Sequence, residues 1–198
     1  MTHVISSKPA IFSAMIAASL SLAACSQNEA SSPDTANPSR TLTHSISSAD
    51  GTALGSLLLQ DLGADGTKIT VTVDGISPGP HAMHFHEIGK CDAPDFKSSG
   101  GHYNPTSSSH GHKTAAGPHA GDMMNVEADA DGTGTFIVIN ERVSINGNHG
   151  LPALLDADGT ALILHAGADD YESQPSGAAG SRIGCAVVGG EAGVFQLE

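Results

Sequence analysis

The stretch Lys68-Ile69-Thr70-Val71-Thr72-Val73 decides the fold class. Apolar and polar residues alternate along it, so Ile69, Val71 and Val73 share one face of an extended strand while the threonines face water. Similar short runs occur at residues 53–60, 82–87, 125–130, 133–139, 161–166 and 183–188. Asp-Gly steps, which favour tight hairpin turns, lie at 50–51, 65–66, 131–132 and 158–159. The sequence therefore predicts an all-β, antiparallel sandwich or barrel of about eight short strands, without an amphipathic helix.

The composition fits one acidic, loop-rich β domain. A chain of 198 residues has the length of about one domain. Its 24 glycines, its lack of tryptophan and its 15% of charged residues suit a β protein better than a helical bundle. Lys and Arg number 8 against 21 Asp and Glu, which gives a net charge of −13. This balance argues against a surface that neutralises nucleic-acid phosphates.

The first residues read as a targeting signal. Lys8 precedes an apolar run at 10–24 that is shorter than a membrane-spanning helix needs, so residues 1–24 are interpreted as a signal peptide. The run ends in Leu22-Ala23-Ala24-Cys25, which resembles a bacterial lipoprotein signal with Cys25 as the lipidated first residue. An ordinary signal peptide with an incidental cysteine is the alternative. Residues 25–40 are polar and predict a flexible linker, which leaves 41–198 as the folded domain.

Two cysteines remain, and the first of them lies in one of two long segments without a strand pattern. Export would place Cys91 and Cys185 in an oxidising compartment, where a disulfide is expected; two free buried thiols are the alternative. Segments 88–124 and 167–182 are rich in Gly and Ser and break the strand pattern, which indicates functional loops. The first of them needs something other than a hydrophobic core to fix it, and a disulfide and a metal would do so.

Histidines are concentrated in one part of the chain. Seven of the 11 lie within residues 81–119. In His84-Phe85-His86 the two imidazoles point to one face of a strand, where they can meet one metal ion. With His165 they begin an imidazole set that suits copper(II). A second set with three imidazoles and one carboxylate suits tetrahedral zinc; it comprises His102, His110, His119 and Asp122.

Six sequence pieces resemble the bacterial copper/zinc superoxide dismutases, of the exported lipoprotein type. They follow the family's order and spacing over about residues 41–190. The resemblance implies a Greek-key antiparallel β-sandwich or barrel, Ig-like, with two long functional loops. The matching pieces are His84-Phe85-His86-Glu87, Gly101-His102-Tyr103-Asn104-Pro105, His110, His119-Ala120-Gly121-Asp122, Leu164-His165 with Asp169, and Gly180-Ser181-Arg182-Ile183-Gly184-Cys185.

The resemblance also implies a role for each site residue. Copper would bind His84, His86, His102 and His165, and zinc would bind His102, His110, His119 and Asp122. His102 would bridge the two ions as an imidazolate. Asp169 would accept hydrogen bonds from His84 and His110, and the Cys91–Cys185 disulfide would hold the metal loop against the barrel. Arg182 would attract and orient an anion, so Arg182 and His102 are the expected catalytic residues.

The implied activity is dismutation of superoxide to dioxygen and hydrogen peroxide by a redox-cycling copper ion, with zinc in a structural role. Such a protein would lie in the periplasm and protect the cell envelope from superoxide. A lipid on Cys25 would hold it to a membrane, and Ser26 favours the outer membrane. The alternative is a non-catalytic copper/zinc-binding or delivery module. A homodimer stays open.

Charge and the remaining polar residues complete the expectations. Loss of residues 1–24 would leave a net charge of −14, and segment 170–179 lacks lysines, so long-range steering of an anion would fall to local cations such as Lys97 or Lys113. Four residues are expected outside the metal sets. His81 and Glu87 are read as structural, His44 and His149 as surface residues. His112 is read as a solvated loop residue, with accessory metal binding as its alternative.

Overall fold

Residues 40–189, the part of the chain that this computed structural model describes, contain nine strands and three single-turn 3₁₀ helices. None of the helices there is long and apolar enough to cross a membrane. The helices are η1 (Gly63–Asp65), η2 (Lys97–Ser99) and η3 (Asn148–Gly150). The strands are β1 (Thr41–Ser47), β2 (Ala53–Asp61), β3 (Thr67–Val73), β4 (Gly79–His81), β5 (Met83–His86), β6 (Val126–Ala128), β7 (Gly134–Asn140), β8 (Thr160–His165) and β9 (Arg182–Val188).

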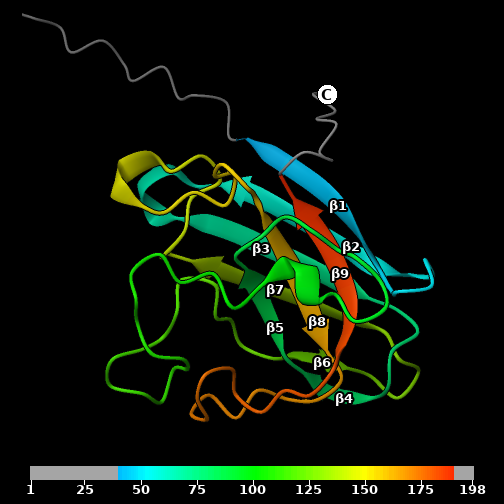
Figure 1. The fold of residues 1–198 in the computed structure, drawn as a ribbon. Coiled ribbons are helices and arrows are strands. Elements are labelled where there is room, and N and C mark those ends of the chain that lie inside the picture. Colours follow the sequence, from blue (N-terminus) through cyan, green and yellow to red (C-terminus); the bar gives the residue numbers. More distant parts are fainter. Residues whose placement is uncertain (1–39, 190–198) are drawn as a thin grey trace, which may run out of the picture. The chain divides into compact units, whose positions relative to one another are not determined.

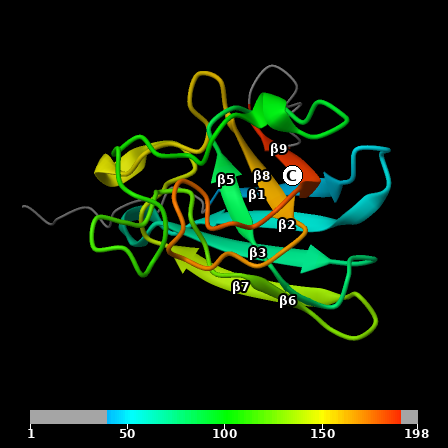
Figure 2. The ribbon, with the colours of Figure 1, turned by 60° about the horizontal axis from the view of Figure 1, so that its bottom comes forward.

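Seven strands form one antiparallel sheet in the order β5-β8-β9-β1-β2-β3-β7, and β4 pairs with β6 in a second, two-stranded sheet. The large sheet curls, so that β5, β8 and β9 lie opposite β2, β3 and β7 (Figures 1 and 2). The curl encloses one main hydrophobic core between the two halves. The expected all-β fold class is confirmed.

The period-two alternation places the core. In β3 the residues Ile69, Val71 and Val73 are buried while the residues between them are partly exposed. Strand β2 repeats the pattern with Leu57 and Leu59 facing inward. In β5 every side chain is buried, because Met83 and Phe85 face the core and the two histidines between and after them are covered by loops. The strand that carries the first histidine pair is thereby fixed from both faces.

Seven of the nine strands coincide with the alternating runs of the sequence, and two were missed. Strand β1 was missed because His44 interrupts its alternation, and β4 because it is short and contains Pro80. The interpretation of His44 as a surface residue was wrong: its side chain is half-buried beside Leu57 on the neighbouring strand, and burial lowers its pKa. Three predictions lie outside the described residues: the signal peptide 1–24, the lipidated Cys25 and the linker up to residue 39.

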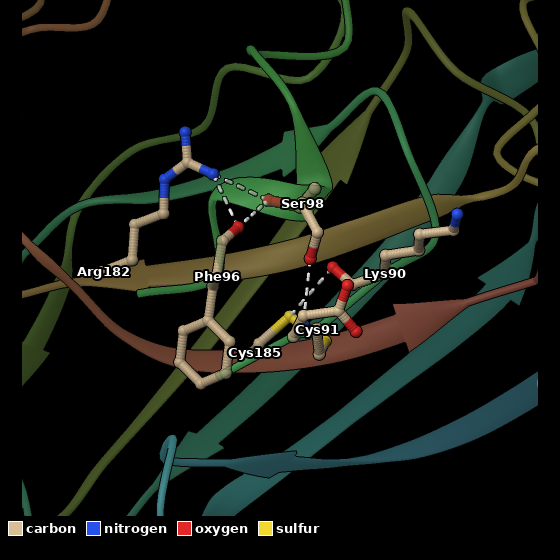
Figure 3. Close-up of a disulfide and its surroundings, with 8 residues drawn as sticks. Lys90, Cys91, Phe96, Ser98, Arg182 and Cys185 are labelled. Atoms are coloured by element: carbon tan, nitrogen blue, oxygen red, sulfur yellow. Dashed lines mark hydrogen bonds between the residues drawn. A yellow bond between two sulfur atoms is a disulfide. The ribbon is translucent and has the colours of Figure 1, made fainter. Parts of the chain in front are cut away.

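The two long connections meet on one side of the curled sheet. One joins β5 to β6 and the other joins β8 to β9; both run beside β5 (green and orange in Figures 1 and 2). The expected disulfide between Cys91 and Cys185 is present, with 5.8 Å between the Cα atoms, and it ties the first connection to β9. Figure 3 shows the bridge beneath the loop of Phe96 and Ser98. Closing a loop of this length stabilises a fold by about 4–5 kcal/mol in the chain-entropy description.

Truncation of an inward leucine on β2 tests the placement of the core. Leu57 is fully buried and its neighbour Leu58 points to the other face. Leu57→Ala should lower the free energy of unfolding by about 2–5 kcal/mol, because it leaves a cavity, whereas Leu58→Ala should cost less than about 1 kcal/mol. Urea unfolding of the oxidised, metal-free protein measures both. Equal losses would mean that the strand register is not the one described.

Candidate metal centre

Strand pairing brings four histidines from distant parts of the chain together. His84 and His86 lie on β5, and His165 ends β8, the strand paired with β5. His102, in the first long loop, forms an isolated antiparallel bridge with His86. The ring centroids of His84 and His102 are 3.9 Å apart, and those of His84 and His165 are 5.1 Å apart.

Each of these four rings presents one buried nitrogen that has no hydrogen-bond partner in the described part of the chain. One ligand nitrogen from each of the four rings lies within 4.8 Å of those of the other three, which is the spacing of ligands around a single ion. The opposite nitrogens are occupied where the chain supplies an acceptor: His86 Nδ1 donates to Gly100 O at 3.0 Å, and His165 Nδ1 to Gly180 O at 3.3 Å. The unpartnered atoms are His84 Nδ1, His86 Nε2, His102 Nε2 and His165 Nε2.

A second buried set shares His102 with the first. His102 Nδ1 lies 2.9 Å from Asp122 Oδ1 and 3.4 Å from His119 Nδ1. His110 Nδ1 lies 3.1 Å from Asp122 Oδ2 without the angles of a hydrogen bond. Three imidazole nitrogens and a carboxylate thus face one point, again within 4.8 Å. This donor set, N₃O, is a closed set of the kind that holds tetrahedral zinc.

Asp169 connects the two sets through the ring nitrogens that do not face a metal position. Its Oδ2 accepts a hydrogen bond from His84 Nε2 at 2.8 Å and its Oδ1 accepts one from His110 Nε2 at 3.0 Å. The carboxylate is 2% exposed, so both bonds are shielded from water. One residue of the second long loop thereby orients a ring of the sheet and a ring of the first long loop.

Burial lowers the pKa of three rings of the first set, those of His84, His86 and His165. It lowers the pKa of His86 to about 2, of His84 to about 3 and of His165 to about 4, and the neighbouring His102 adds to the shift in each case. These rings are neutral at neutral pH, which is the form in which imidazole binds a metal ion.

In the second set the balance differs between rings: burial lowers the pKa of His119, whereas that of His110 is raised. Burial alone would lower the pKa of His110, but the carboxylates of Asp122 and Asp169 raise it to about 9. Burial alone would also raise the pKa of both carboxyl groups. For Asp122 the hydrogen bonds with His102 and with the Gly111 N–H and the close approach of His110 outweigh burial. For Asp169 the hydrogen bonds from His110 and His84 outweigh it, so the pKa of both carboxyl groups stays well below the usual range. The carboxylates are therefore ionised and provide the negative charge that a cation needs.

Arg182 is a cation held beside the first set. Its Nη1 donates to Phe96 O at 2.8 Å (Figure 3) and to Ser99 Oγ at 2.9 Å. Its Nη2 donates to Gly100 O at 2.8 Å. Gly100 O is also the acceptor of His86, so one carbonyl oxygen holds both side chains. The positive charge of Arg182 contributes to the lowered pKa of His86 and His165.

The remaining histidines and Glu87 lie outside both sets. His81 Nδ1 donates to His165 O at 2.7 Å, and its Nε2 lies 2.8 Å from Ser77 O, which is a structural role. Glu87 Oε1 accepts from the backbone of Gly101 at 3.0 Å. His112 and His149 are exposed; the ring of His112 packs edge-on against Tyr171.

Two side-chain amides that the sequence did not single out hold the backbone of site residues. Gln174 Oε1 accepts from the His110 N–H at 2.9 Å while its Nε2 donates to His110 O at 2.9 Å. Asn125 pairs with the N–H and C=O of Asp169 in the same way, at 2.9 and 3.1 Å. A single Asn or Gln in a loop carries no spacing signal, so only the folded structure reveals these two residues.

Comparison with known proteins gives a consistent result. Residues 53–188 match the family model described as copper/zinc superoxide dismutase (SODC). The chain is 39% identical over 144 residues to a superoxide dismutase [Cu-Zn] of Caulobacter vibrioides, covering 72% of this chain and 82% of that protein. A crystal structure of a SOD-like protein from Bacillus subtilis matches with a TM-score of 0.70 and 35% identity, covering 74% of this chain and 97% of that one.

A relative with a different printed role is also similar. The copper chaperone for superoxide dismutase of Homo sapiens is 33% identical over 152 residues, which cover 74% of this chain and 52% of that protein.

Replacement of Gly177 tests the bonds of Asp169. A Cβ at Gly177 would collide with Asp169 Oδ1 and would lie 2.7 Å from His110 Nε2. Gly150 has a similar positive φ, +77° against +71°, but its Cβ would meet nothing within 4 Å. Gly150→Ala should therefore cost only the backbone strain of about 1–2 kcal/mol, and Gly177→Ala about 2 kcal/mol more, because buried hydrogen bonds break. Urea unfolding of both variants measures the difference; equal losses would contradict the role given to Asp169.

Proposed function

Since this chain belongs to the copper/zinc superoxide dismutase family, we propose that its buried histidine cluster holds both ions and dismutates superoxide to dioxygen and hydrogen peroxide. Copper and zinc are the family's cofactors, and the donor atoms present here suit them. The observation that carries the proposal is the group of four buried imidazole nitrogens that converge without any hydrogen-bond partner in the described part of the chain. Buried polar atoms are rarely left unpaired unless something absent from the protein chain completes them.

In this assignment copper takes the four-imidazole set and zinc takes the N₃O set. Four nitrogen donors suit copper(II), and three imidazoles with a carboxylate suit zinc. His102 belongs to both sets, with Nε2 facing the first and Nδ1 the second. An imidazole can use both nitrogens only after it has lost its proton, and two neighbouring cations favour that loss. The copper ligands are His84, His86, His102 and His165; the zinc ligands are His102, His110, His119 and Asp122.

Bound copper would supply one-electron redox chemistry that oxidises one superoxide to dioxygen and reduces a second, with two protons, to hydrogen peroxide. The chain's own residues do the rest. His102 can hold a proton at Nε2 and pass it to the reduced product. Arg182 attracts the anion and orients it, since its guanidinium is held rigidly by three acceptors and stays charged. Asp169 keeps His84 and His110 in their ligating orientation.

Substrate attraction must be local in this protein. The mature chain proposed here has a net charge of −14, which repels an anion at distances where salt does not screen it. Of the two lysines considered for steering, Lys97 is paired with Asp95 at 2.6 Å, which offsets its charge, while Lys113 donates to the neutral Asp170 O at 2.8 Å and keeps its charge. The positive field at the copper set is assigned to the metal ions and Arg182.

The proposed location is the periplasm, with a lipid on Cys25 that holds the domain to a membrane, in the first place the outer membrane. The protein would remove superoxide that reaches the cell envelope. Support comes from the signal-like residues 1–24 and from the Cys91–Cys185 disulfide, because disulfides persist mainly in oxidising compartments.

The second candidate function is a non-catalytic copper/zinc-binding or delivery module. The similarity to a copper chaperone favours it. The presence of all four copper histidines together with Arg182 favours the enzyme, because a delivery module needs no fixed cation at the metal.

Turnover of the wild-type protein separates the two functions, and loss of one copper ligand tests whether that turnover depends on the copper set. His165→Ala should lower copper-dependent superoxide turnover by at least about 100-fold, because it removes a copper donor and no zinc donor, and about one zinc per chain should remain. Metal content by mass spectrometry and the rate of superoxide decay are the measurements, on protein reloaded with both ions. His149→Ala, which changes an exposed histidine, is the matched control. A wild-type protein that binds both ions without turnover would establish the delivery module instead.

A substitution at residue 25 tests the lipid anchor. Cys25→Ser should abolish labelling with radioactive fatty acid, since the lipid has no other attachment point in this assignment. Ser26→Ala keeps the cysteine and should be labelled like the wild type. A wild-type protein without label, or a Cys25→Ser protein that is still labelled, would contradict the lipid anchor at Cys25.

A further inference from the structure

The turn at 119–122, His119-Ala120-Gly121-Asp122, carries two of the four proposed zinc ligands. All four of its carbonyl oxygens accept hydrogen bonds. The carbonyl oxygen of Gly121 accepts a hydrogen bond from the backbone N–H of Phe85 at 3.0 Å. The other three accept from side chains of Asn140 and Arg142, at and just beyond the end of β7.

Arg142 reaches both ligand residues at once. Its Nε donates to His119 O at 3.3 Å and its Nη2 donates to Asp122 O at 2.8 Å. Asn140, which is 2% exposed, donates from Nδ2 to Ala120 O at 2.9 Å. The planar, forked guanidinium can bind two carbonyl oxygens in fixed geometry, which a lysine ammonium on a flexible stem cannot do.

The two residues are themselves fixed to the sheet. Asn140 Oδ1 accepts from the Arg142 N–H at 3.0 Å, and the carbonyl of the next residue, Val143, accepts from the buried Thr67 Oγ1 at 3.1 Å. Thr67 and Asn140 are paired neighbours on β3 and β7. The donors therefore stand on the rigid core, and the turn is positioned against them.

Charge adds to this arrangement. Arg142 is half-buried, and burial lowers its pKa, while the negative charges of Asp122 and Glu141 oppose the shift. The guanidinium therefore lies close to the negative charge of Asp122 and forms its hydrogen bond with the backbone oxygen, not with a carboxylate oxygen, of that residue. The carboxylate oxygens are left to His102, His110 and the backbone N–H groups of Gly111 and His119.

We propose that Asn140 and Arg142 form a clamp that positions His119 and Asp122 and so sets the zinc affinity of the site separately from its copper affinity. The inference rests on the zinc ligand set proposed above. Arg142 is a positioning residue, since it touches the backbone of two ligands and neither metal. Partners of this kind change metal affinity by about 10- to 100-fold.

The test is metal affinity in a set of single variants of the full, oxidised chain. Arg142→Met keeps the apolar stem and removes both donors; Arg142→Lys restores a cation that reaches one carbonyl. The control is Lys68→Met, a cation on β3 beside β7 whose side chain forms no hydrogen bond with the turn in the described region. Zinc and copper affinities are measured by competition with chelators, and the visible absorption of bound Co²⁺ reports tetrahedral geometry at the zinc position.

The clamp predicts a selective loss. Arg142→Met should bind zinc about 10- to 100-fold more weakly, with a weakened Co²⁺ band, while copper affinity changes by less than about threefold. Arg142→Lys should recover part of the zinc affinity, and Lys68→Met should match the wild type. If Arg142→Met gives no soluble protein, Arg142→Gln, which keeps one amide donor, should show about a tenfold zinc loss.

Two results would overturn the clamp: unchanged zinc affinity in the Arg142→Met or Arg142→Gln protein, or equal losses for zinc and copper, which indicate general destabilisation. His119→Ala separates this failure from failure of the ligand set. If His119→Ala still binds zinc like the wild type, the ligand assignment falls and the clamp with it. If His119→Ala loses zinc and Arg142→Met does not, only the clamp falls.

Discussion

The paired hydrogen bonds of Asp169 to His84 and His110 are the interaction on which the centre depends. One carboxylate, almost without solvent contact, joins a strand of the sheet, the first long loop and the second long loop. Such bonds add to the apolar contacts by which Phe96, Tyr103 and Met123 of the first long loop pack into the core. Asn125 and Gln174 act in the same direction, since each binds the backbone of a residue in the other loop.

The fold was accessible from the sequence wherever one face of a strand is buried and the other is wet. The alternation of Ile69, Val71 and Val73 is the clearest case. Of the four Asp-Gly steps, those at 50–51 and 65–66 join paired strands, whereas those at 131–132 and 158–159 do not lie in hairpins between consecutive paired strands. Strand β1 escaped because a polar residue, His44, takes an inward position that the alternation reserves for an apolar one. Period-two patterns cannot show that β5 is buried on both faces, since the cover of its histidine face comes from loops distant in sequence.

The sequence predicted the ligands of the candidate site but not the residues that support them. The spacing of His84 and His86 along one strand indicates a pair of metal ligands, and the concentration of the later histidines indicates further ligands. Arg142 and Asn140 carry no such signal, because what they bind is backbone. Every residue has a backbone carbonyl oxygen with the same chemistry. The sequence therefore does not show which carbonyl oxygens an arginine side chain will bind. Only the path of the chain reveals it.

The acceptors behind the copper-side rings also fix the tautomer of each ring. A nitrogen that faces a carbonyl or carboxylate oxygen must carry the hydrogen, so His84 is the Nε2–H tautomer, while His86 and His165 are Nδ1–H tautomers. The lone pairs of His84 Nδ1, His86 Nε2 and His165 Nε2 are thereby directed at one point before any ion arrives. These three ligands need no proton shift and no ring flip to accept a metal. The fold has selected one tautomer of each of these three imidazoles, and with it the nitrogen that an incoming ion meets.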